Sequence, residues 1–151
     1  MEIAFCSGHV NLTSQEFEQH YQPKLEEAIA KEHHFVVGSS PGADTMVLDF
    51  LINRLMESSR IKVYLFERNS GRDQQCRERY TSLGIPFQFG FNSYTSRDAQ
   101  MTKDSTYDIA WVRPLAESKK LLGSDFNPKR ISGTQRNLDR RQKACKDENS
   151  R

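Results

Sequence analysis

Residues 34 to 55, HFVVGSSPGADTMVLDFLINRL, decide the fold. The stretch begins with the short apolar run from His34 to Val37, which is typical of a buried strand. A turn of small residues follows, and then apolar residues recur at the spacing of one helical face: Ala43, Met46, Val47, Phe50, Leu51 and Leu55. The stretch therefore predicts a strand, a tight turn and an amphipathic helix, which together make one unit of an alternating β/α fold.

The same alternation recurs along the whole chain. Apolar runs predict four further strands, at residues 3–6, 61–66, 87–91 and 107–112. Helices are expected after the capping-box pair Thr13 and Glu16, over residues 71–83, near residues 97–103, and for about ten residues from Ser132. Pro23 should kink or split the first of these helices, and residues 113–131 are predicted to form a surface loop. The pattern indicates an α/β protein with a Rossmann-like three-layer fold, in which helices flank a mainly parallel sheet of about five strands.

Composition limits the class of protein. The chain has 151 residues, the size of one domain, and its 22 Lys and Arg nearly balance its 20 Asp and Glu, so charge alone does not indicate a nucleic-acid partner. No apolar run approaches the ~18 residues of a membrane span, the N-terminus lacks the pattern of a secretory signal, and three scattered cysteines do not make a disulfide scaffold. We expect a cytoplasmic protein with one domain over residues 1–141 and a charged C-terminal tail, residues 142–151, that frays.

Three turns of small residues carry the candidate chemistry. They follow the first strand, follow the second strand, and open the last helix: Ser7, Gly8 and His9; Gly38, Ser39, Ser40, Gly42, Ala43 and Asp44; and Ser132, Gly133 and Thr134. The carboxyl ends of parallel strands meet at one edge of a sheet, where exposed amides and helix N-termini bind phosphate. A single glycine after a strand is as often a plain turn residue, and the chain has neither a Walker A nor a GxGxxG motif. Taken together, the three turns predict a site for an anionic ligand.

The segment from Val36 to Met46 resembles the glycine-rich second turn of the SLOG superfamily, which includes LOG-type phosphoribohydrolases and DprA-type proteins. Arg97 and Met101 followed by the strand from Tyr107, and the later Ser132-Gly133-Thr134, are similar to further motifs of that superfamily. The resemblance covers roughly residues 1–140. It implies a Rossmann-like nucleotide-binding domain, a ligand-facing Arg97, and a homodimer, for which the helix near Cys76 to Tyr80 is a candidate surface.

One departure from the LOG pattern bears on catalysis. Gln135 and Arg136 stand where LOG enzymes have a hydrophobic residue and a catalytic glutamate, and a carboxylate is needed to cleave an N-glycosidic bond. Glu67, directly after the third strand, is the candidate replacement; alternatively it forms an ion pair with Arg68 or Arg72. Whether the protein is an enzyme therefore stays open.

Two polar residues of the predicted edge each have two possible roles. Arg97 either binds a ligand phosphate or forms an ion pair with Asp98 or Asp104, and Asp108 either binds a ligand or caps a turn. We expect a sensor or binding module for a nucleotide-type small molecule. The first alternative is a hydrolase or transferase acting at an N-glycosidic bond, and the second, less favoured, is a nucleic-acid-binding protein. His33 and His34 have no Cys or carboxylate at metal-ligand spacing, and the spacing of Glu16 and His20 alone is weak evidence for a metal, so we predict no metal site and no cofactor.

Overall fold

The computed structural model describes residues 1–54, 57–66 and 71–150. Leu55 and Glu67, both singled out above, lie outside these ranges. The strands are β1 (Ile3–Cys6), β2 (His34–Val37), β3 (Ile61–Phe66), β4 (Phe87–Phe91) and β5 (Tyr107–Ile109). The helices are α1 (Ser14–His20), α2 (Gln22–Ala30), α3 (Ala43–Asn53), α4 (Gly71–Leu83), α5 (Tyr94–Asp104), α6 (Leu115–Leu122) and α7 (Gly133–Asn149), with short 3-10 turns η1 (Ser58–Arg60) and η2 (Gly123–Asp125).

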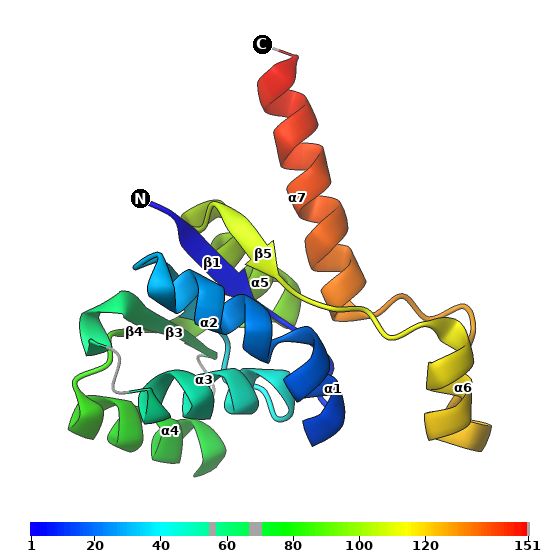
Figure 1. Ribbon diagram of the computed structural model, residues 1–151, viewed down its shortest axis with the longest axis horizontal. Coiled ribbons are helices and arrows are strands. Elements are labelled where there is room, and N and C mark those ends of the chain that lie inside the picture. Colours follow the sequence, from blue (N-terminus) through cyan, green and yellow to red (C-terminus); the bar gives the residue numbers. More distant parts are fainter. Residues whose placement is uncertain (55–56, 67–70, 151) are drawn as a thin grey trace.

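The strands form one sheet in the order β4-β3-β2-β1-β5, and every neighbouring pair is parallel. The chain adds β2, β3 and β4 on one side of β1 and then crosses to place β5 on the other side (Figure 1). The topological switch point therefore lies between β1 and β5, and ligands of such sheets bind outside the carboxyl ends of the strands at this point. The predicted α/β Rossmann-like architecture is confirmed, and the sheet is parallel throughout the described strands.

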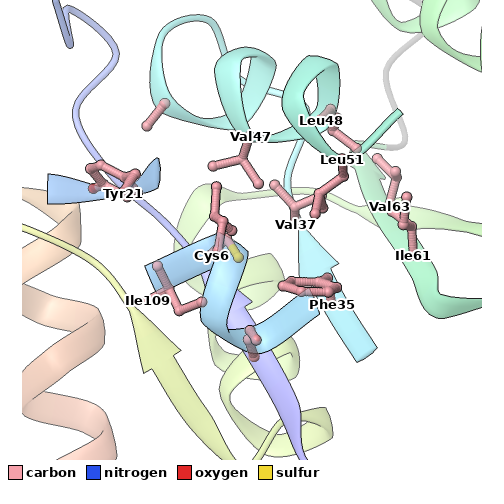
Figure 2. Packing of buried hydrophobic residues seen from close by; sticks show 14 of the residues in the cluster. Cys6, Tyr21, Phe35, Val37, Val47, Leu48, Leu51, Ile61, Val63 and Ile109 are labelled. Carbon is pink, nitrogen blue, oxygen red and sulfur yellow. The ribbon is translucent and has the colours of Figure 1, made fainter. Parts of the chain in front are cut away.

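Two apolar layers cover the sheet, one on each face. The larger layer lies between the sheet and α1 to α4, and Figure 2 shows Val47 and Leu51 of α3 against Val37 and Val63. The smaller layer packs Met101 of α5 on strand residues Phe5, Val36 and Tyr64. Adjacent strand residues alternate between the layers: Cys6 belongs to the first and Phe5 to the second. Helix α7 lies against α5 and β5 on the second face.

Local signals in the first helical region are confirmed. Thr13 and Glu16 form both bonds of the capping box at the start of α1. The helix pattern then splits at Tyr21, and Pro23 stands in the first turn of α2, where a missing N–H costs nothing.

Three segments differ from the prediction. The segment predicted as a loop contains α6, which begins after Pro114 and ends at Gly123, a residue with a φ of 55°. Strand β5 ends at Ile109 rather than at residue 112, because the Trp111 N–H turns to the Tyr21 hydroxyl, 3.1 Å away, instead of a neighbouring strand. Helix α7 has 17 residues and continues to Asn149, through most of the tail that we expected to fray. Across the described ranges, no helix is long and apolar enough to cross a membrane.

Candidate functional site

A cavity of about 1080 Å³ opens at the carboxyl edge of the sheet. Its walls come from the turn after β1, the first half of α5, the chain on both sides of α6, and the start of α7. In Figure 1, α6 stands to one side of the sheet and α7 begins between the two. The cavity therefore occupies the switch point, where the topology predicts a ligand.

The turn after β1 is held rigidly. The buried Tyr21 hydroxyl donates to the Ser7 carbonyl at 2.7 Å and accepts the Trp111 N–H, so it joins the ends of β1 and β5. A Cβ on Gly8 would collide with that hydroxyl and lie 2.5 Å from the Ala43 Cβ, so only glycine fits here. Ser7 is buried, and its Oγ has no hydrogen-bond partner among the described residues. Ser7, Gly8 and His9 all line the cavity.

In the turn after β2, backbone amides already donate hydrogen bonds within the protein. The Ser40 N–H donates to the Asp44 carboxylate at 3.0 Å, and the Ala43 N–H donates to the His9 carbonyl at 3.1 Å. Gly42, at a φ of 79°, lies so close to the carbonyls of His9 and Val10 that a side chain would not fit. From this turn, the cavity lining includes Ser40 and Asp44 but not the other predicted site residues, Gly38, Ser39, Gly42 and Ala43. The glycines here serve close packing of the backbone.

Arg97 lies buried at the centre of the edge, with 4% of its surface exposed. Its Nε lies 3.3 Å from Asp98 Oδ1, and its Nη2 lies 3.4 Å from Ser40 Oγ and 3.9 Å from Asp44 Oδ2. The guanidinium occupies the space beside Gly38, where an added Cβ would be 2.8 Å from its Cζ. Its Nη1 is buried and has no partner within the described chain.

The expected ion pair of Arg97 with Asp98 is thus present, whereas Asp104 bonds instead to the Tyr64 hydroxyl at 2.6 Å and to Gln100 at 2.9 Å. Met101, one turn further along α5, is buried and also lines the cavity.

The third turn, at the start of α7, has free space beside its glycine. The Ser132 side chain caps α7 by accepting the Gln135 N–H at 3.1 Å, and Gly133 has no atom within 4 Å of the place where a Cβ would stand. The first N–H groups of an α-helix lack intrahelical acceptors, and the helix dipole is positive there. Arg130 and Arg136 are exposed at this end of the cavity, and neither forms an ion pair with a carboxylate of the described ranges. Ser132, Gly133 and Thr134 all line the cavity.

Sequence reasoning missed one polar group of this site. Arg113 is buried and forms two 2.7 Å bonds with the Glu16 carboxylate, while its backbone N–H donates to His9 Nε2 at 2.9 Å. Burial lowers the pKa of His9 and the charge of Arg113 lowers it further, so the imidazole is neutral near pH 7 and carries its proton on Nδ1. The signal was available, because Arg113 directly follows the apolar run that predicts the last strand, which places it near the carboxyl edge.

Two further candidates have structural roles. Asp108 pairs with Arg141 of α7, whose guanidinium also donates to the carbonyls of Thr102 and Ser105 at 3.0 Å. Tyr80 is buried in the larger core layer and so cannot form a contact surface for a partner. Within the described ranges, no group of three His, Cys, Asp or Glu side chains is arranged to hold a metal ion.

Comparison with protein-family models, curated proteins and solved structures finds no match to this chain.

Proposed function

We propose that the protein binds a nucleotide, or a phosphorylated small molecule derived from one, at the carboxyl edge of its sheet, as a sensor or ligand-binding module. One observation carries the proposal: a single cavity joins the open N-terminus of α7, two arginines that form no ion pair within the described ranges, and two lining residues that each hold a buried polar atom without a partner there. Those atoms are Arg97 Nη1 and Ser7 Oγ.

Each of these features favours an anion with several oxygens. A buried polar group without a hydrogen bond costs roughly 1–3 kcal/mol, which a ligand oxygen would recover. A helix N-terminus binds phosphate through its free amides and its dipole, and a guanidinium suits phosphate oxygens. The resemblance to the SLOG superfamily supports the same ligand class and also implies a homodimer.

Three carboxylates line the cavity: Asp125 is exposed in η2, whereas the two beside Arg97 are already bonded within the protein and so favour binding over catalysis there. Asp44 accepts the Ser40 N–H, and Asp98 accepts bonds from Arg97 and from Asn137. A carboxylate that stabilises a developing oxocarbenium ion must face the ligand with a free oxygen, and these two already hold the protein together. Cleavage at an N-glycosidic bond stays the alternative, with Glu67 as its candidate residue.

The test uses a matched pair of substitutions at Gly133. We expect Gly133→Asp to weaken binding of the best of the four ribonucleoside monophosphates at least tenfold in isothermal titration, because its carboxylate occupies the anion position. Gly133→Ala adds a side chain in the same open space without charge and should bind as the wild type does. Both variants should remain folded. The added side chain meets no atom within 4 Å, and an aspartate in the first turn of a helix stabilises it by about 0.3–1 kcal/mol through its interaction with the helix dipole.

The outcomes separate the three candidate functions. Equal affinity of Gly133→Asp and wild type, or no binding of any nucleotide by the wild type, would refute the proposal. Release of free base during incubation would identify an N-glycosidic hydrolase. Tight binding of DNA with no response to mononucleotides would favour a nucleic-acid-binding protein.

A further inference from the structure

One aromatic ring in the lining of the cavity remains largely exposed. Tyr94 is the first residue of α5, at the carboxyl edge, and 61% of its surface is accessible to solvent. The larger apolar side chains that line the neighbouring part of the cavity, Phe5 and Met101, are buried. An exposed tyrosine in a ligand cavity offers a flat apolar face at low cost in conformational entropy.

Contacts with two side chains hold the ring of Tyr94 in place. It meets Phe66 edge to face, with 4.6 Å between ring centroids and an interplanar angle of 83°, and the Arg97 guanidinium lies 5.3 Å from its centroid. The backbone is fixed as well, because the Ser93 side chain caps α5 by accepting the Ser96 N–H. The exposed surface of the ring is therefore a preformed contact surface.

The position of Tyr94 relative to the start of α7, where the anion is proposed to bind, suits a nucleotide. Asp98 of α5 accepts a 3.1 Å bond from Asn137 of α7, so the two helices are joined there. Tyr94 precedes Asp98 by four residues and Gly133 precedes Asn137 by four, so each lies roughly 6 Å, slightly more than one turn, towards the start of its helix. Packed helices lie about 8–10 Å apart, which is the scale of a base, a ribose and a phosphate in sequence.

We propose that Tyr94 stacks on the base of the bound nucleotide while the phosphate lies at the start of α7. This inference rests on the proposed function and narrows it: the ligand carries an aromatic base, and a bare sugar phosphate would use only the α7 end. Stacking tolerates every base, because each has a π face, so Tyr94 supplies affinity for nucleotides as a class.

The experiment compares two kinds of probe, nucleotides that carry a base and a sugar phosphate that has none. Wild type, Tyr94→Ala and Tyr94→Phe are titrated with the four ribonucleoside monophosphates and with ribose 5-phosphate. We expect Tyr94→Ala to lose about fivefold to a hundredfold in affinity for the monophosphates, the range that aromatic stacking on one base covers. Its affinity for ribose 5-phosphate should be unchanged, and Tyr94→Phe, which keeps the ring, should bind both probes as the wild type does.

Phe89→Ala is the control for loss of an exposed aromatic ring. Phe89 is 55% exposed on β4, outside the cavity lining, and its removal should leave both affinities unchanged. Tyr94→Leu keeps apolar bulk without a flat ring; should the alanine variant fail to fold, this one tests the same claim.

Each remaining outcome overturns a stated claim. Equal monophosphate affinity of wild type and Tyr94→Ala would end the stacking proposal and leave the proposed function intact. An equal loss for both probes would show that Tyr94 acts by holding Arg97, which also overturns stacking. A wild type that binds neither probe would refute the proposed function itself.

Discussion

Replacement of Gly38 by alanine tests the position of the buried guanidinium at the centre of the site. A Cβ on Gly38 would lie 2.6 Å from Asp44 Oδ2 and 2.8 Å from both Cζ and Nη2 of Arg97. Side-chain carbons almost never approach other atoms to less than 3.0 Å, so the carboxylate and the guanidinium must both move. Movement disturbs contacts that both side chains make: Arg97 lies beside the ring of Phe66, with 4.7 Å from Cζ to the ring centroid, and is bonded to Asp98, while Asp44 accepts the Ser40 N–H.

The expected cost follows from this crowding. Adding one carbon to a closely packed interior typically destabilises a protein by about 1–3 kcal/mol. We expect a loss of about 2 kcal/mol in the free energy of unfolding, which a domain of this size with a typical stability of roughly 5–15 kcal/mol tolerates. Urea denaturation measures it. Gly133→Ala is the control, because its methyl group has no neighbour within 4 Å and should cause no such loss.

A double-mutant cycle with Arg97→Gln makes the test specific. Glutamine is shorter and lacks the Cζ and Nη2 atoms, so in that background two of the three closest contacts of the new methyl group are removed and the one with the Asp44 carboxylate remains. The cost of Gly38→Ala should then fall by about 1 kcal/mol, within the coupling range of about 0.5–3 kcal/mol seen for residues in contact. The same cost in both backgrounds would refute the placement of the guanidinium beside Gly38.

Two further predictions concern the polar groups around the switch point. Hydrogen bonds from Arg113 hold the pKa of Glu16 at about 2, below its ordinary value of 4.5, so the stabilisation by this pair is complete above pH 4.5 and is lost as the pH falls towards 2. Glu16→Gln can still complete the capping box but cannot ionise, so urea denaturation at a series of pH values should show a smaller loss of stability between pH 4.5 and 2 than in the wild type; parallel curves would contradict this. Tyr21→Phe removes the hydroxyl that bonds Ser7 and Trp111, and we expect a loss of about 1–3 kcal/mol in thermal unfolding, followed by the fluorescence of the only tryptophan. An unchanged melting temperature would show that water replaces the hydroxyl.

Much of the fold is predictable because its signals are local. The capping box at Thr13, the proline that separates α1 from α2, and the amphipathic pattern after Gly42 each act over a few residues, and each element forms where its signal stands. The strand order β4-β3-β2-β1-β5 has no local signal, since the crossover that places β5 beside β1 depends on packing of the whole chain.

The missed features have different causes. Helix α6, with the sequence LAESKKLL, consists almost entirely of residues with high helix propensity, and the prediction missed it because the wider stretch from residue 113 to 131 is polar and contains prolines. The pair of Arg113 and Glu16 joins residues 97 positions apart, and no spacing rule reaches that far. The sequence predicts Arg97 as a candidate site residue, but its burial beside Gly38 depends on a close approach of two elements.

The glycines show why a motif and a site are different things. Gly8 and Gly42 are in the expected turns, yet the structure uses them to bring the chain after β1 against the start of α3, and the Ala43 N–H there already donates to His9. The free amides that could bind an anion are therefore those at the start of α7. That helix has few buried residues and is held mainly by polar bonds, from Asn137 to Asp98 and from Arg141 to Asp108. A ligand that joins the start of α7 to Arg97 would add a bond across the same contact, so binding and the docking of α7 should stabilise each other.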